Sequence, residues 1–248
     1  MGISIGPKIV TDGLMLCLDA GDLNSYPGSG TDCYDLSGNV NNGSLSVESI
    51  GTTTSGSMSF TGTGDITGTP PGDYIIIPQE ITRVQNYPNG VTYNIWINPD
   101  VNERRALLWG SGTMRHMEVY CGSAGGSFRT EAALQNGYSF GANAPSDGVP
   151  INTWTNITVV WAPHDTIRPV YWYKNGILFY THPNFHSGTG GESEDFYFTG
   201  IGRATGSVTY TYAKSWSGKI DCFKIYNKSL SESEILQNYN SQKGRFGK

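Results

Sequence analysis

The stretch PVYWYKNGILFYTH, residues 169–182, gives the clearest indication of the fold. Two runs rich in β-branched and aromatic residues flank the dipeptide Asn175-Gly176. An Asn-Gly pair supplies the positive φ angles of a tight turn between antiparallel strands. The stretch therefore predicts a β-hairpin. Tyr171 and Tyr173 should lie on one face of it and Trp172 on the other, because side chains alternate along a strand.

Similar short apolar runs recur along the chain and are separated by Gly, Pro and Asn. They lie at residues 13–20, 73–78, 91–98, 105–110, 116–121, 154–162, 195–202 and 218–227. Closely spaced strands with turn signals and almost no helical periodicity are typical of a sandwich or a barrel. The sequence therefore predicts an all-β protein.

One short helix is predicted near the end of the chain. Ser231 and Glu234 have the spacing of a capping box, and Ile235, Leu236 and Tyr239 give the following turns one apolar face. No linker or shift in composition divides the sequence. We therefore predict a single domain over residues 1–248, with short extensions at 1–12 and 241–248, of which the basic C-terminal tail is expected to be solvated.

The composition excludes several classes of function. Charged residues make up only 15% of the 248 residues, and the formal net charge is −5, which argues against a nucleic-acid partner. No run approaches the roughly 18 apolar residues of a membrane span, and the first residues do not resemble a secretory signal. The four cysteines form no CxxC motif, so zinc is not expected and free thiols are.

Several segments together resemble the concanavalin A-like, laminin-G-type jelly roll. They are residues 57–78 (SMSFTGTGDITGTPPGDYIIIP), 91–99 (VTYNIWINP), 154–163 (WTNITVVWAP), 171–180 (YWYKNGILFY) and 218–235 (GKIDCFKIYNKSLSESEI). The resemblance implies a two-sheet antiparallel jelly-roll sandwich with one short C-terminal helix. It also implies that the first and last strands pair, with Leu14–Leu18 beside Ile220–Ile225. Cys17 and Cys222 would then be near neighbours, and whether they form a disulfide stays open.

A narrower likeness concerns jelly-roll proteins of tailed bacteriophages. Residues 8–21 (KIVTDGLMLCLDAG), 25–45 (SYPGSGTDCYDLSGNVNNGSL) and 235–247 (ILQNYNSQKGRFG) are similar to them, although Cys33 stands where these proteins often have Trp. This likeness implies a non-enzymatic virion surface protein, such as a capsid decoration protein. Its expected partners are other virion proteins and, weakly, host-surface glycans, and it would be assembled in the host cytoplasm. A free carbohydrate-binding lectin or adhesin module is the first alternative, and a glycoside hydrolase is the second.

The hydrolase alternative needs two carboxylates about 5–5.5 Å apart in a retaining enzyme. The sequence offers Glu192, Glu194 and Asp195, which follow a Gly-rich loop and are interpreted as solvated acids. The four histidines are interpreted as surface residues without ligand spacing. We therefore predict no catalytic residues.

Sugar binding is favoured over hydrolysis, because the sequence has 15 Tyr and 6 Trp residues that could stack on a sugar. Trp96, Trp154 and Trp161 are expected in the core. The candidate exposed rings are those beside Gly-rich turns or on the predicted hairpin: Trp109, Tyr138, Tyr171, Tyr173 and Trp216. For Trp109, Tyr138 and Trp216, core packing is the favoured interpretation and sugar stacking is the alternative. On the hairpin, either the Tyr171 and Tyr173 side or the Trp172 side is expected to be core.

The stretch DLSGNVNNGSL, residues 35–45, is rich in turn formers and side-chain oxygens. Asp and Asn close turns with their own side chains, so a structural corner is the favoured interpretation. A structural calcium ion is the alternative, because calcium takes six to eight oxygen ligands. The candidate ligands are Asp19, Asp35, Asn39 and Asp221. Apart from this ion, no cofactor is expected.

Overall fold

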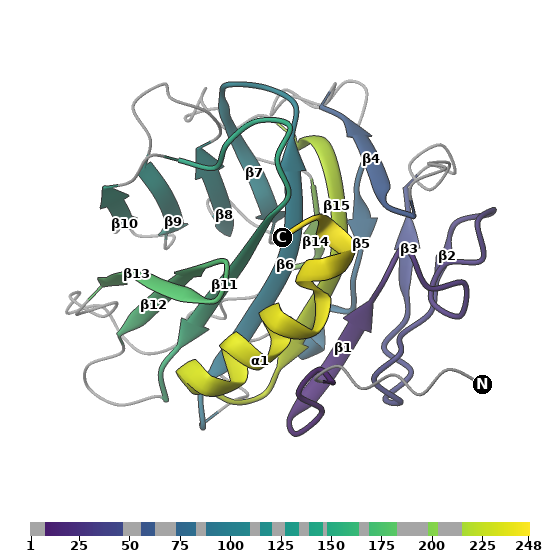
Figure 1. The fold of residues 1–248 in the computed structure, drawn as a ribbon, viewed down its shortest axis with the longest axis horizontal. Helices are drawn as coiled ribbons and strands as arrows, with labels where there is room; N and C mark the ends of the chain where they lie inside the picture. Colours follow the sequence, from purple (N-terminus) through teal and green to yellow (C-terminus); the bar gives the residue numbers. More distant parts are fainter. Residues whose placement is uncertain are drawn as a thin grey trace.

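The structure is a computed structural model of the chain. It describes residues 8–46, 56–62, 73–82, 88–109, 115–120, 127–133, 139–145, 148–163, 169–182, 198–202 and 215–248. Within these ranges, side chains are described except those of Arg104, Ala106, His182 and residues 109–147. Figure 1 shows strands arranged in two layers, with one helix lying across them. No helix among the described residues is long and apolar enough to span a membrane.

The first sheet, here called sheet A, contains both the first and the last strand. Its order is β1-β15-β6-β11-β12-β13, and β4 also pairs with β15. The strands are β1 (Leu14–Leu18), β4 (Met58–Thr61), β6 (Val91–Pro99), β11 (Thr155–Trp161), β12 (Val170–Lys174), β13 (Ile177–His182) and β15 (Ser217–Tyr226).

The second sheet, sheet B, has the order β10-β9-β8-β7-β14-β5-β3-β2. Its strands are β2 (Asp32–Cys33), β3 (Gly43–Leu45), β5 (Ile75–Ile76), β7 (Arg104–Trp109), β8 (Arg115–Tyr120), β9 (Ser127–Ala133), β10 (Ser139–Pro145) and β14 (Gly200–Ile201). A 3-10 helix, η2 (Gln79–Thr82), follows β5. The strand pairs of both sheets are antiparallel, so the predicted all-β jelly-roll sandwich is confirmed.

The main core lies between the two sheets. Ile95 and Ile97 of β6, Phe223 of β15 and Leu107 and Leu108 of β7 are among its members, and each is at most 2% exposed. Side chains in between on β6 and β15 point away from this core, as the two-residue period of a strand requires. The outer face of sheet A therefore carries a second, more polar set of side chains.

The closing strands pair as predicted. Leu14 lies opposite Tyr226, and Leu18 lies opposite Phe223. The ladder between β15 and β6 is interrupted between Asp221 and Lys224, where Cys222 has a φ of +47°. A positive φ is rare for a residue with a side chain and marks a bulge in the strand. Cys17, Cys33 and Cys222 are all free and buried, which answers the question of a Cys17–Cys222 disulfide.

The predicted hairpin and helix cap are both present. Asn175 and Gly176 have φ angles of +53° and +78° between β12 and β13. Helix α1 (Glu232–Gln242) begins after Ser231, whose hydroxyl accepts a hydrogen bond from the backbone of Glu234. The Glu234 side chain accepts one from the Ser231 backbone in return, which completes the capping box.

Helix α1 lies across the outer face of sheet A (Figure 1). Ile235 is fully buried there with Val160, Tyr173 and Tyr226. The chain then continues as a 3-10 helix, η4 (Lys243–Phe246), and Phe246 is 7% exposed. The prediction of a solvated C-terminal tail is therefore wrong, because Phe246 packs on the aromatic rings of the sheet.

Residues 35–45 form a corner that is fastened to β1. The Asp35 carboxylate accepts hydrogen bonds from the backbone amides of Cys17, Ser37 and Asn41, at 2.8, 2.8 and 3.0 Å, and from the Ser37 hydroxyl. The amide of Asn39 donates to the backbone oxygen of Leu14 at 2.9 Å. Both Asp35 oxygens are therefore occupied by the corner itself, as the structural interpretation predicts.

Candidate functional site

The outer face of sheet A divides into a covered part and an open part. On neighbouring strands, Asp221 of β15 lies opposite Trp96 of β6, and two residues earlier Lys219 lies opposite Asn98. Residues 239–246 cover the first pair through Tyr239, Gln242, Arg245 and Phe246. The second pair belongs to an open cleft.

Aromatic rings form the centre of the covered part. The Trp96 ring is stacked with Phe246, at a centroid distance of 4.1 Å, and with Tyr239, at 5.7 Å. The Trp154 ring also contacts Phe246, with a centroid distance of 4.9 Å and a tilted orientation. The indole nitrogen of Trp96 donates a hydrogen bond to Gln242 at 3.2 Å. Such contacts fix the position of the last turn of the chain.

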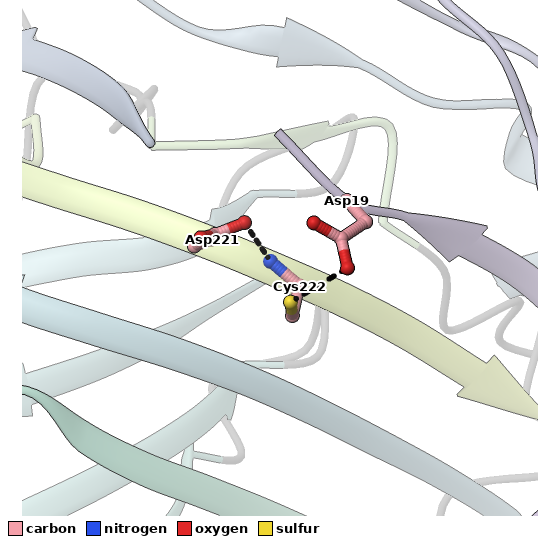
Figure 2. Close-up of side chains that lie close together, drawn as sticks. All are labelled: Asp19, Asp221 and Cys222. Carbon is pink, nitrogen blue, oxygen red and sulfur yellow. Dashed lines mark hydrogen bonds between the residues drawn. The ribbon is translucent and has the colours of Figure 1, made fainter. Parts of the chain in front are cut away.

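Arg245 connects the C-terminal segment to two carboxylates, and we call Arg245, Asp19, Asp221 and Cys222 the Arg245 clasp. The guanidinium donates to Asp19 at 2.6 Å and to Asp221 at 2.5 Å. Figure 2 shows Asp19, at the end of β1, facing Asp221 and Cys222 of β15. The Cys222 thiol donates to Asp19 at 3.2 Å, and the other oxygen of Asp221 accepts from the backbone amides of Ala20 and Cys222.

Gly21 makes room for this arrangement. A Cβ atom at Gly21 would lie 2.0 Å from a guanidinium nitrogen of Arg245. Any larger residue there would force the guanidinium away from its two carboxylates. The clasp therefore depends on a glycine as well as on its charged members.

The two carboxylates of the clasp have opposite pKa shifts. Burial raises the pKa of Asp221 to about 6, although the Arg245 charge acts against the shift. Burial also acts to raise the pKa of Asp19, but the charge and hydrogen bonds of Arg245 outweigh it, so the Asp19 pKa is lowered. The difference follows from exposure, because the Asp221 side chain is 2% exposed and that of Asp19 is 15% exposed. Burial raises the pKa of the Cys222 thiol well above its ordinary value, so the thiol stays protonated.

Two acids with pKa values shifted apart are also what a glycosidase uses. Atoms of Asp19, Asp221 and Cys222 lie within 4.8 Å of one another, which is also close enough to share a metal ion. However, Arg245 already compensates both carboxylates, and both oxygens of Asp221 have hydrogen-bond donors. The cluster therefore has the chemistry of a structural ion pair.

The calcium prediction finds only partial support in the geometry. Asp19 and Asp221 come together, but Asp35 and Asn39 belong to the corner beside β1 and are bonded within it. The four candidate ligands therefore do not form one set. The Arg245 guanidinium already lies between Asp19 and Asp221, and a calcium ion needs six to eight oxygen ligands. These residues therefore do not fit a calcium ion.

The open part is a cleft of about 350 Å³ at the ends of β4, β6 and β15. Its polar lining consists of Ser59, Asn98, Asp100, Asn152 and Lys219. Ser59, Lys219 and Asn98 stand side by side on the three strands, because Lys219 pairs with both of the others. Gly218 allows the strands to approach, since a Cβ atom there would lie 2.3 Å from the Asn98 carbonyl oxygen.

The polar side chains of the cleft have no partners among the described residues. Across the described part of the chain, none of the five makes a side-chain hydrogen bond or an ion pair. Polar groups with open donors and acceptors in a concave surface are what a small polar ligand requires. The volume of the cleft lies at the lower end of the range of about 300–1,000 Å³ that is usual for small-molecule sites. Sequence reasoning missed this site, because its residues come from four separate segments and share no motif.

None of the aromatic residues predicted for sugar binding whose side chains the structure describes presents an open ring face. Trp216 is fully buried in the main core, so the favoured interpretation of core packing is confirmed there and the alternative of an exposed sugar-binding ring is wrong. Tyr173 is 5% exposed beneath helix α1, and Tyr171 is partly buried against the same cluster, so neither presents an open ring face. The Trp109 side chain and Tyr138 lie outside the described residues, as do Glu192, Glu194 and Asp195. The core prediction is confirmed for Trp96 and Trp161, whereas Trp154 is only partly buried.

Comparison with protein families gives one match. Residues 67–236 match a laminin G family model described as the concanavalin A-like lectin/glucanases superfamily. The chain belongs to this superfamily. No curated protein sequence is significantly similar to it.

Solved structures support the same concanavalin A-like fold. Domain 4 of AbnA, a GH43 extracellular arabinanase from Geobacillus stearothermophilus solved with arabinotriose, is 14% identical with a TM-score of 0.59, and the match covers 91% of this chain and 98% of that domain. The binding domain of botulinum neurotoxin DC, solved with SialylT, is 15% identical with a TM-score of 0.60, covering 94% of this chain and 52% of that one. The binding domain of Paraclostridial Mosquitocidal Protein 1 is 17% identical with a TM-score of 0.59, covering 93% and 52%. The chain thus spans about half the length of the two toxin domains.

Proposed function

We propose that the chain is a non-enzymatic glycan-binding domain and that the cleft formed by Ser59, Asn98, Asp100, Asn152 and Lys219 holds the sugar. The observation that carries the proposal is a cleft of about 350 Å³ whose polar side chains have no hydrogen-bond or ion-pair partner among the described residues. Hydroxyl groups of a sugar both donate and accept hydrogen bonds. Amide, hydroxyl, carboxylate and ammonium groups together satisfy both needs.

The proposal has two further supports. Membership in a lectin and glucanase superfamily makes sugar the first ligand to consider, and a structural neighbour was solved with arabinotriose. At 14% identity this neighbour supports only the fold. The proposal of sugar binding therefore rests on the side chains of the cleft in this chain.

A glycan array with the purified chain tests the proposal. Asn98→Leu removes an amide from the cleft, and we expect it to abolish the signal on every glycan that the unmodified chain binds. Asn240→Ala is the matched control, because Asn240 is an amide-bearing residue on helix α1 outside the cleft. Binding that survives Asn98→Leu at full strength would place the site elsewhere, and an array without any signal would end the proposal.

We infer further that the domain is carried on the surface of a tailed-phage particle. The support is the likeness of residues 8–21, 25–45 and 235–247 to phage jelly-roll proteins. These three segments also come together in the fold: residue 10 bonds to Asn238, and residue 17 bonds to Asp35. Mass spectrometry of purified particles tests this location. Absence of the chain from the particle would leave a free lectin as the remaining assignment.

The absence of hydrolysis is also a proposal. Among the described residues, Asp19 and Asp221 form a close pair of acids, and Arg245 is bonded to both. We expect no release of reducing sugar from any glycan that the array identifies. Hydrolysis that is lost in Asp221→Asn would assign the activity to the clasp, and hydrolysis lost in a Glu192→Gln/Glu194→Gln double variant would assign it to the second acid group.

A further inference from the structure

Lys219 differs from the other basic side chains of the described structure that are at least partly buried. Lys224 bonds to Gln242 at 2.7 Å, Lys228 pairs with Asp12 and Glu234, and Arg105 pairs with Glu103 at 3.1 Å. Lys174 and Lys243 lie over the rings of Phe179 and Tyr239. Lys219 is likewise only partly exposed, yet among the described residues it has no hydrogen-bond, ion-pair or ring partner.

The side chains that flank Lys219 on the two neighbouring strands are short and uncharged. Ser59 of β4 and Asn98 of β6 are its neighbours across the strands. Asp100 also lines the cleft but does not form an ion pair with Lys219. The ammonium group therefore has no counter-ion among the described residues, and its three N–H donors are available to an anionic ligand.

We propose that the ligand of the cleft is an acidic glycan, and that Lys219 binds the sugar carboxylate while Ser59, Asn98 and Asn152 bind neighbouring hydroxyls. This inference rests on the proposed glycan-binding function and adds a ligand class to it. A sugar carboxylate carries one negative charge, and a charge-assisted hydrogen bond to it is stronger than a bond to a hydroxyl.

The remaining charges of the cleft and of the chain limit the ligand class. Asp100 would repel a second negative charge, so a doubly charged phosphate fits the cleft less well than a carboxylate. A polyanion such as a nucleic acid needs several basic groups, whereas the chain has a net charge of −5 and the cleft contains one lysine. Sugars of the uronic or sialic type combine one carboxylate with several hydroxyls, which matches the lining.

The test is a glycan array built from matched pairs, in which each acidic glycan is printed beside the same glycan with its carboxylate methyl-esterified. We expect the unmodified chain to bind the acidic member about ten-fold more tightly, which corresponds to one charge-assisted hydrogen bond. Titration calorimetry on the best pair then measures the same ratio for Lys219→Gln. We expect that variant to bind the acid and the ester equally and to keep the affinity for the ester.

Lys8→Gln is the matched control, because Lys8 is exposed and is not among the residues that line the cleft. It should keep the ten-fold preference, and Lys219→Arg should keep most of it. Added salt should reduce the preference, because it screens the charge of a partly exposed group. Equal binding of acid and ester by the unmodified chain, or an unchanged preference in Lys219→Gln, would overturn the inference and leave the glycan-binding function standing. An array without any bound glycan would overturn both.

Discussion

The two parts of the outer face of sheet A differ in how their polar groups are satisfied, although they lie only two residues apart on the same strands. At the covered end, the charged groups of Asp19, Asp221 and Arg245 all have partners within the protein. At the open end, Asn98 and Lys219 have none among the described residues. The C-terminal segment makes the difference, since it covers one part and stops short of the other.

This difference reflects the cost of removing polar groups from water. A buried charge without a partner costs several kcal/mol. The C-terminal segment can therefore cover Asp221 only because the same segment supplies Arg245 as its partner. A polar group in an open cleft keeps its bonds to water and can exchange them for bonds to a ligand. The covered part should therefore respond to substitution through stability, and the open part through binding.

Arg245→Ala should have the largest effect on stability. It leaves two carboxylates close together without a cation, and we expect the free energy of unfolding to fall by about 2–4 kcal/mol. The value lies below that of a fully buried pair, because the Arg245 side chain is 36% exposed. Denaturant unfolding at pH 7 measures it.

A second substitution tests the cause of that loss. Asp221→Asn removes one of the two charges, so adding it to Arg245→Ala should restore part of the lost stability. Lys248→Ala serves as the control, since Lys248 is an exposed basic residue of the same segment. Additive effects of the two substitutions would show that the clasp does not act as a unit.

The pH dependence of stability should report the Asp221 carboxyl group. Its pKa is about 6 in the folded chain against an ordinary value of 3.8, so between about pH 4 and pH 6 the folded state holds a proton that the unfolded chain has released. Stability must therefore fall as the pH rises through this window, by up to about 3 kcal/mol from this group. Asp19, whose pKa is lowered, acts in the opposite sense and only at lower pH, where protonation removes its contribution.

Unfolding free energies at pH 4, 5, 6 and 7 for the unmodified chain and Asp221→Asn check this prediction. The unmodified chain should lose stability relative to the variant as the pH rises from 4 through 6, and the difference should level off by about pH 7. Parallel curves over the whole range would mean that burial of Asp221 does not perturb its ionisation.

Asp35→Ala tests the corner formed by residues 35–45. It removes the acceptor of four hydrogen bonds, three of them from backbone amides, and should cost about 2 kcal/mol. Because the donors are the protein's own, a chelator should leave the melting temperature of the unmodified chain unchanged. A melting temperature that falls in EDTA would restore the calcium interpretation.

The smallest effects on stability belong to the cleft. Asn98→Leu and Lys219→Gln remove groups that have no partner among the described residues, so each should change the free energy of unfolding by less than about 0.5 kcal/mol. The same denaturant measurement checks this. A loss as large as that of Arg245→Ala would make these residues structural and would remove the contrast between the two parts of the face.

Much of the fold could be predicted from local sequence. Asn175-Gly176 fixed a hairpin because few dipeptides adopt two positive φ angles, and Ser231 with Glu234 fixed a helix start because the cap is made within four residues. The pairing of β1 with β15 followed from family resemblance. Strands β9 and β10 were missed, because residues 127–133 and 139–145 contain few β-branched residues and no long apolar run.

Little of the candidate site could be predicted in this way. Arg245 stands in a basic tail that looks solvated, and only the folded chain brings it to Asp19, which is 226 residues away in sequence. Trp216 stands beside a glycine-containing turn and is a candidate for an exposed ring, yet it lies in the main core because the strand that begins directly after it, β15, is an inner strand of sheet A. The pattern of residue types along the chain does not predict that the C-terminal segment covers Asp221 and leaves Lys219 open.

The sequence by itself determined the apolar strands, the hairpin turn and the helix cap, because these depend on φ and ψ preferences and hydrogen bonds between residues close in the chain. Only the tertiary structure decided which face of sheet A the last residues cover, and hence which acids are paired and which polar groups stay open. That decision depends on contacts between segments more than 100 residues apart, such as Arg245 with Asp19 and Phe246 with Trp96. The cleft exists because those contacts end at Trp96 and leave Asn98 and Lys219 uncovered.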